Sequence, residues 1–384
     1  MSSKNNLNRI TGQFILAGIF SLTLSSCGGG GSSAPADGSG DDTSDNIDTS
    51  DTGVVTGSPQ VIGSVLMPVP VSGGGLIPLL DRNIAAGVAV SGNHAYVAAG
   101  SSGLQVVDVS NKSTPTVVAE NNTISPRGSV SFSDLDSNIL YVAGGLTGVH
   151  MVELITPTIP DVIKTLDATG VGHNTFDAKN LPGTSTVCSA DGLAGIQIYA
   201  GITEITLSSA PESVHGVAVS GDYCFATGAL GGTQGLYVVD LSTPTSPAIV
   251  KKLDLGGLPS GIAIAGNYAY IVAGNPGMYV VDISDPLNPF IAGQTEGLPT
   301  TGPIAVDATR MRAYLGTVDT AGFPEDGMKI IDISNADAPV VIATTDLPER
   351  TGGVFAQDGY VYATTTPALL NGDAMLHIID VSAY

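Results

Sequence analysis

An all-β fold is predicted by three features of the sequence. Glycine and proline are abundant, with 50 and 23 of 384 residues, and Val, Ile, Ala and Gly dominate in place of long helical stretches rich in Glu, Lys and Leu. Short alternating apolar runs are separated by Gly-Asn and Gly-Asp pairs, which favour tight hairpin turns. One apolar phrase that ends in an acidic residue returns along the chain. Together these features predict many short antiparallel strands.

The acidic phrase defines a repeat. Its clear copies end in Asp108, Asp240, Asp282, Asp332 and Asp380, each followed by an aliphatic residue and Ser. The spacings are 132, 42, 50 and 48 residues, and 132 is three times 44. Two divergent copies fill the long gap: residues 149–155 carry Glu153 in the acidic place, and residues 196–202 have lost the acid. The sequence therefore predicts seven units with a period in the forties.

Each unit is predicted to hold four strands. A first strand such as GVAVS (residues 87–91) leads through a Gly-Asn or Gly-Asp turn to a second such as AYVAA (residues 95–99). The acidic phrase is the third strand. A proline five residues past the Ser, such as Pro289, opens the fourth. Units of forty-odd residues with four strands are typical of β-propeller blades, so we expect seven four-stranded blades.

The two ends of the repeat region predict how the ring closes. The chain ends at Tyr384, two residues past the last Ser, which leaves the seventh unit without a fourth strand. Residues 59–67 form an apolar strand that belongs to no unit. We expect this N-terminal strand to complete the last blade and to remove an exposed edge. The predicted propeller domain covers residues 58–384.

The phrases LYVVDLS (236–242), MYVVDIS (278–284), LHIIDVS (376–382) and GNYAYIVAG (266–274), with the strand-opening prolines, resemble those of LVIVD-repeat proteins. These are surface propellers of bacteria and archaea. The resemblance implies the fold of residues 58–384 and leaves the function open, because members of the family differ in role.

The first residues are predicted to target the chain to the cell envelope. Lys4 and Arg9 precede an apolar run at residues 14–24, and Leu24-Ser25-Ser26-Cys27 follows. This order resembles a bacterial lipoprotein signal peptide over residues 1–26, with lipidation (palmitate) at Cys27. The alternative is an ordinary secretory peptide with an incidental Cys. Resemblance to enterobacterial lipoproteins associates an Asp after the Cys with inner-membrane retention. Residue 28 is Gly, so we expect an outer-membrane lipoprotein, displayed in the periplasm or at the cell surface.

Residues 27–57 read as a flexible tether, rich in Gly, Ser and Asp. Its run DDTSDNIDTSD offers oxygen ligands for calcium, but the glycine and ligand register of a calcium-binding loop is missing, so a solvated spacer is preferred. The formal net charge of −22 argues against nucleic-acid binding. We expect a monomer whose membrane contact is the lipid.

Candidate ligand-binding residues lie just before each predicted first strand, where propeller blades surround the mouth of the channel. They are Arg127, His173, His215, Ser260, Thr301 and Arg350. Two Arg and two His could bind an anionic ligand or a metal. The alternative is that these positions merely face water, and two His fall short of the three or four ligands that a metal usually requires. We therefore predict no catalytic residue, metal or cofactor.

The sequence thus favours a non-catalytic binding or protein-interaction scaffold, whose partner is an envelope protein, a polymer or a small ligand. The alternative is an extracytoplasmic enzyme or a ligand- or metal-binding protein that uses Arg127, His173, His215 and Arg350 at the mouth.

Three further expectations concern single residue types. Asp282 and its repeats are expected to end strand three by accepting backbone N–H groups. His94, His150 and His377 fall within strand or turn patterns and are expected to be structural. Cys188 and Cys224 align two residues apart, with Val97 and Ala95, which points both to the same face of their blades. An oxidising compartment permits a disulfide, but adjacent blades present opposite faces to each other, so we expect these cysteines to stay unpaired.

Overall fold

The computed structural model describes residues 58–68, 85–166, 172–205, 207, 212–230, 232–295, 298, 302–317, 327–366 and 374–384. The predicted signal peptide, Cys27, the tether up to residue 57 and Thr301 lie outside these ranges. Within them, no helix is long and apolar enough to cross a membrane.

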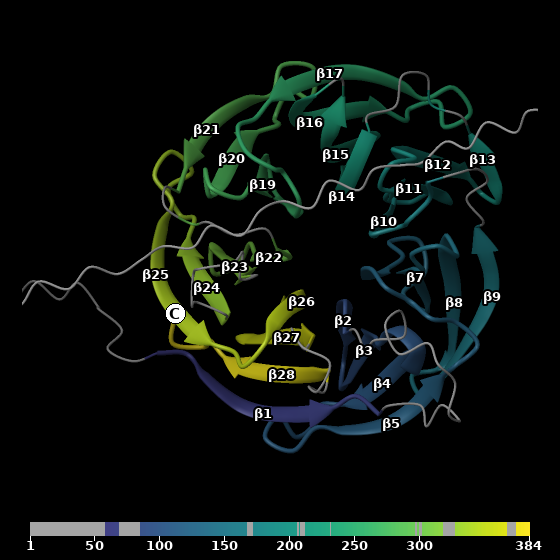
Figure 1. Cartoon of the computed structure of the whole chain (residues 1–384), viewed down its shortest axis with the longest axis vertical. Helices are drawn as coiled ribbons and strands as arrows, with labels where there is room; N and C mark the ends of the chain where they lie inside the picture. Colours follow the sequence, from purple (N-terminus) through teal and green to yellow (C-terminus); the bar gives the residue numbers. More distant parts are fainter. Residues whose placement is uncertain are drawn as a thin grey trace, which may run out of the picture. The chain divides into compact units, whose positions relative to one another are not determined.

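Seven four-stranded antiparallel sheets form a ring, as predicted (Figure 1). Six blades use consecutive strands. Blade 1 holds β2 (Gly87–Ser91), β3 (His94–Ala98), β4 (Leu104–Asp108) and β5 (Thr116–Asn121), with a short 3-10 turn η1 (Gly100–Ser102). Blade 2 holds β6 (Val130–Phe132), β7 (Ile139–Ala143), β8 (Val149–Thr156) and β9 (Ile159–Leu166). Blade 3 holds β10 (Asp177–Asn180), β11 (Thr186–Ala190), β12 (Ile196–Ala200) and β13 (Thr203–Ile205).

The second half of the ring follows the same order. Blade 4 holds β14 (Glu212–Ser220), β15 (Tyr223–Leu230), β16 (Thr233–Asp240) and β17 (Ala248–Asp254). Blade 5 holds β18 (Ile262–Ala265), β19 (Tyr268–Val272), β20 (Met278–Asp282) and β21 (Phe290–Gln294). Blade 6 holds β22 (Ile304–Asp307), β23 (Arg312–Thr317), β24 (Gly327–Asp332) and β25 (Val340–Asp346). Blade 7 holds β26 (Arg350–Gln357), β27 (Tyr360–Thr366), β28 (Met375–Asp380) and, from the other end of the chain, β1 (Gln60–Leu66).

Closure of the ring by β1 is confirmed. β1 pairs antiparallel with β28, from Gln60 opposite Asp380 to Leu66 opposite Met375. Ser64 and His377 lie opposite each other in this pairing, and the Ser64 hydroxyl is 2.8 Å from Nδ1 of His377. The remaining ring nitrogen of His377 lies 3.0 Å from Oγ1 of Thr365 in β27. One buried imidazole therefore joins the N-terminal strand to two C-terminal strands.

The core lies between the blades. Each pair of neighbouring blades shares an apolar cluster, so the core is a set of layers arranged around the ring. First strands also approach the next blade closely. A Cβ added at Gly87 would lie 2.5 Å from the carbonyl oxygen of Gly128, and one at Gly216 would lie 2.4 Å from that of Ser260. These contacts require residues without a side chain, because real Cβ atoms stay outside 3.0 Å.

The repeated aspartates end the third strands, as predicted. Oδ1 of Asp108, Asp240, Asp282, Asp332 and Asp380 accepts the backbone N–H of the Ser two residues on, at 2.8 to 2.9 Å. These are Asx turns, in which a local side chain replaces a backbone acceptor. The repeated acid therefore has a structural role.

The expectation that Cys188 and Cys224 stay unpaired is wrong. They form a disulfide with a Cα–Cα distance of 6.5 Å, which joins blades 3 and 4. The sequence alignment of blade 3 was one residue out of register. Cys188 lies opposite Ile198, which makes it equivalent to Tyr96 of blade 1 and not to Val97, whereas Cys224 is equivalent to Ala95. An odd offset places the two thiols on opposite faces of their blades, and so toward each other.

Candidate functional site

The first strands of all seven blades surround a cavity of about 1080 Å³ along the axis of the ring. Strand pairing sets which residues are equivalent around it. One ring of wall positions comprises Gly87, Ser129, Asp177, Gly216, Gly261, Pro303 and Gly353. Two residues further along each strand lies a second ring, comprising Ala89, Ser131, Lys179, Ala218, Ala263, Ala305 and Phe355. Most members of both rings are small and uncharged.

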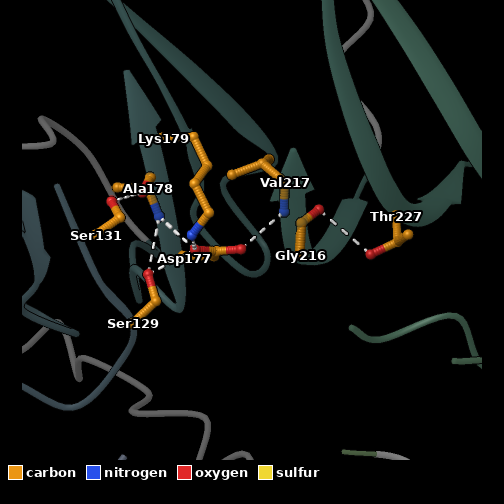
Figure 2. Close-up of polar contacts among 8 residues, drawn as sticks. All are labelled: Ser129, Ser131, Asp177, Ala178, Lys179, Gly216, Val217 and Thr227. Carbon is orange, nitrogen blue, oxygen red and sulfur yellow. Dashed lines mark hydrogen bonds and ion pairs between the residues drawn. The ribbon is translucent and has the colours of Figure 1, made fainter. Parts of the chain in front are cut away.

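Blade 3 breaks this pattern with a carboxylate and an amine. Asp177 occupies a place that is Gly in four other blades, and Lys179 a place that is Ala in four. Their side chains form an ion pair, with Nζ of Lys179 2.5 Å from Oδ1 of Asp177 (Figure 2). The Lys179 side chain keeps 29% of its surface exposed, and that of Asp177 14%. The pair therefore borders the cavity while its carboxylate is largely enclosed.

Asp177 accepts hydrogen bonds from residues of blades 2, 3 and 4. Oδ1 accepts the Ser129 hydroxyl of blade 2 at 2.5 Å and the N–H of Ala178 at 2.9 Å. Oδ2 accepts the N–H of Val217 in blade 4 at 3.1 Å (Figure 2). Ser131 adds a parallel link by donating to the carbonyl of Ala178 at 2.8 Å. Both carboxylate oxygens are thus occupied by protein donors.

Of the six candidate residues named for the mouth, four line the cavity. They are Arg127, His215, Ser260 and Arg350. The ring of His215 lies against that of Phe176, with centroids 5.0 Å apart and planes inclined at 35°. Burial lowers the pKa of His215, although a hydrogen bond with the Ser213 backbone opposes this effect. A neutral His215 at neutral pH follows.

His173 differs from the other candidates. Its Nδ1 lies 3.3 Å from Oδ2 of Asp191, and it is not among the described residues that line the cavity. The Asp191 side chain is fully buried, and burial raises the pKa of its carboxyl above the usual value even though Thr175 and His173 favour the charged form. Across the described residues, no three His, Cys, Asp or Glu side chains gather where they could hold a metal ion.

Two other histidines, His150 and His377, are buried and contact hydroxyl groups. His150 is 4% exposed, and its ring nitrogens lie 2.9 Å from the hydroxyls of Thr147 and Thr165. His377 has the equivalent place in blade 7 and is likewise enclosed. Both observations agree with the prediction from the strand pattern.

Sequence reasoning missed Asp177 and Lys179. The first strands of the clear repeats read GVAVS, GVAVS and GIAIA, whereas blade 3 reads DAKN. Because the third unit has also lost its acidic phrase, its first strand could not be aligned, and the two charged residues had no assigned position. The sequence did carry a signal for these two residues, because the first strands of the clear repeats contain no charged residue, whereas DAKN contains both an Asp and a Lys.

Four blades share the same turn between strands two and three, beside the mouth. The first residue of the turn donates its backbone N–H to the carbonyl of the residue four positions later, as from Ala99 to Gly103 at 2.9 Å in blade 1. Two glycines of the turn have positive φ, as at Gly145 (61°) and Gly148 (82°) in blade 2. The residue after the first glycine varies. It is Ser101 in blade 1, Leu146 in blade 2, Leu193 in blade 3 and Asn275 in blade 5.

The two leucines are 82% and 74% exposed. Polar residues serve at the same place in blades 1 and 5, so the turn itself does not require an apolar side chain there. These turns lie on the mouth face, because Gly145 and Gly192 bridge to Thr175 and Val214, which lead into the next first strands.

Comparison with known proteins identifies three segments of the chain as LVIVD repeats, residues 83–123, 212–254 and 256–296. They correspond to blades 1, 4 and 5. No curated protein matches the chain as a relative.

Solved structures with a similar fold include two β-propeller domains. The β-propeller domain of Cps50 (Swd1) from Myceliophteria thermophila is 12% identical with a TM-score of 0.59, covering 77% of this chain and 96% of that one. The WD40 β-propeller domain of Doa1 is 12% identical with a TM-score of 0.61, covering 84% and 97%. The computationally designed Ika8 protein is 12% identical with a TM-score of 0.53, covering 78% and 98%. At these identities the likeness concerns the fold alone.

Proposed function

We propose that this propeller with LVIVD repeats is a non-catalytic binding module of the bacterial cell envelope, held by lipid on Cys27 and offering its mouth face to a protein partner. A β-propeller provides a rigid disc with loops of variable sequence on a constant frame, which suits protein interaction. The signal-peptide pattern before Cys27 supports the anchor, and the acidic tether supports a disc held away from the membrane.

The direction of β1 supports display of the mouth face. First strands begin at the mouth and fourth strands end there, because each linker to the next blade lies on that side. As the fourth strand of blade 7, β1 begins at Gln60, beside Asp380 at the opposite face. The described chain therefore enters the disc, at Ser58 and Pro59, on the face away from the mouth.

The observation that carries the proposal is the pair of exposed leucines in equivalent turns of adjacent blades. Leu146 and Leu193 stand where blades 1 and 5 have Ser101 and Asn275. Burying each side chain against a partner would contribute about 1.5 to 3 kcal/mol. Single exposed apolar residues are common on protein surfaces, whereas exposed apolar residues that gather on one face mark interaction sites, and these two leucines lie on the same face in adjacent blades.

The test is crosslinking of the full-length protein to its envelope neighbours. The double variant Leu146→Asp/Leu193→Asp should lose the partner that the wild type captures. Ile159→Asp/Ile163→Asp is the matched control, because both isoleucines are exposed on the outer strand of blade 2. Equal capture by the wild type and the leucine variant would refute an interaction through these turns.

The anchor is tested separately. Cys27→Ser should move the protein from the membrane fraction to the soluble fraction after cell lysis. Retention of that variant in outer membranes would contradict lipidation as the means of attachment.

An extracytoplasmic enzyme is the second candidate, favoured by the presence of Arg127, His215 and Arg350 at one cavity. The contact of His173 with Asp191 weakens the original set of four. A reaction that needs His215 as a base would be abolished by His215→Ala in a folded protein, whereas a scaffold would tolerate that change.

A further inference from the structure

At the level of the two rings of wall positions, the cavity has two chemically different sides. Blades 2 and 3 provide Ser129, Ser131, Asp177 and Lys179. Across the ring, blades 5, 6 and 7 provide Ala263, Ala305 and Phe355 at the level of Lys179 (Figure 1). A molecule that fits both sides needs a polar end and an apolar end.

The polar side offers positive charge to a ligand. Both oxygens of Asp177 already accept protein donors, from Ser129, Ala178, Lys179 and Val217. An ammonium group has three donors, and the contact of Nζ of Lys179 with Asp177 uses one of them. The Lys179 side chain is still 29% exposed beside the cavity. The carboxylate therefore fixes the amine in place, and the amine keeps donors for an anion.

The charge around the cavity is opposite to that of the chain. Three cations, Arg127, Lys179 and Arg350, and one carboxylate, Asp177, line it, whereas the whole chain carries −22. A concave site with low-dielectric walls concentrates ions of the opposite sign. The lining thus carries more basic than acidic side chains, which suits an anionic ligand better than a cationic one.

From this arrangement we propose that the channel binds a small organic carboxylate with an apolar tail, with Lys179 as the residue that binds its carboxylate. The tail lies against the Ala263, Ala305 and Phe355 side. The cavity of about 1080 Å³ is slightly larger than the usual range for small-molecule sites, so a short-chain acid fits with water beside it. This site goes beyond the protein interaction proposed above and does not depend on Leu146 or Leu193.

The probe is hexanoate, titrated into the full-length protein and followed by NMR chemical shifts at neutral pH. A ligand of this size should bind with a Kd on the order of 1 mM. Hexanamide, which has the same tail without the charge, and acetate, which has the charge without the tail, should both bind much more weakly. Absence of saturation by hexanoate at about 20 mM would overturn the proposal.

Lys179→Met should lower the affinity for hexanoate about tenfold or more, since it removes a charge-assisted hydrogen bond. Lys252→Met is a closely matched control: Lys252 is also 29% exposed and also pairs with an Asp two residues away, Asp254 at 2.9 Å, but it lies on the outer strand β17. The Lys252→Met variant should bind hexanoate with the affinity of the wild type.

Two further variants test the site in case Lys179→Met does not fold. Lys179→Arg keeps the charge and should keep most of the binding. Ala263→Glu leaves the Asp177 contacts intact and should weaken hexanoate binding by placing a carboxylate across the cavity. Equal affinity of the wild type and Lys179→Met, or equal binding of hexanoate and hexanamide, would show that Lys179 does not bind a carboxylate.

Discussion

His377 is predicted to make the closure of the ring sensitive to acid. It is 3% exposed in β28, with Ser64 of β1 and Thr365 of β27 as its two partners. Burial lowers its pKa from 6.5 to about 4. Between these two values the unfolded chain binds a proton that the folded ring excludes. Stability is therefore unaffected above the unfolded pKa and falls as the pH drops from 6.5 toward 4.

The magnitude follows from the size of the shift. Each pKa unit corresponds to about 1.4 kcal/mol, and at about pH 4.5 most of the interval has been crossed, so the loss relative to neutral pH is about 2.5 kcal/mol. His377→Gln should remove this loss, because Gln does not titrate. The chain already places Gln105 and Gln197 at the equivalent position of blades 1 and 3.

The assay is urea unfolding of the wild type and of His377→Gln at about pH 7 and about pH 4.5. Other groups also titrate in this interval, so the informative quantity is the difference between the two proteins in their loss of stability. His94→Gln is the control, since His94 is only partly buried at the start of β3. If His377→Gln and the wild type lose stability equally on acidification, the reasoning is refuted.

Three more predictions concern the frame of the propeller. Reduction of the Cys188–Cys224 disulfide, which spans 36 residues, should lower the free energy of unfolding by about 3 to 4 kcal/mol, measured by denaturant unfolding with and without reductant. Gly216→Val should cost about 1 to 3 kcal/mol or prevent folding, because its Cβ would meet the Ser260 carbonyl; an unchanged melting temperature would contradict the close approach. Asp282→Ala should cost about 0.5 to 1.5 kcal/mol by removing the acceptor of one Asx turn, and unchanged urea stability would count against that role.

The blades, their number and the closing strand could be predicted because each rests on local patterns that recur. The Asp and Ser of each third strand interact across two residues, so the turn is encoded within the phrase itself. The orphan strand before blade 1 and the missing strand after β28 were complementary, and pairing them leaves neither edge exposed.

Contacts between blades were harder to predict, because they depend on register. A shift of one residue in blade 3 exchanged its two faces and produced the wrong expectation for Cys188. The same divergence prevented the alignment of Lys179. Without that alignment, the sequence did not show that four other blades have Ala at its position. His173 was assigned to the mouth by spacing alone, and spacing cannot show that a buried carboxylate, Asp191, lies beside it.

The pairing of β1 with β28 also determines how the disc would carry a mechanical load. β1 begins at Gln60 on the face opposite the mouth, so a pull on the preceding chain away from that face is directed along β1. Force along a strand strains its cross-strand hydrogen bonds together, whereas force across the strand would open them one after another. The backbone pairs between β1 and β28, with the Ser64–His377 contact among them, would therefore resist sliding as a unit. If the proposed anchor at Cys27 and the proposed partner at the mouth both hold, the disc would be loaded in its stronger direction.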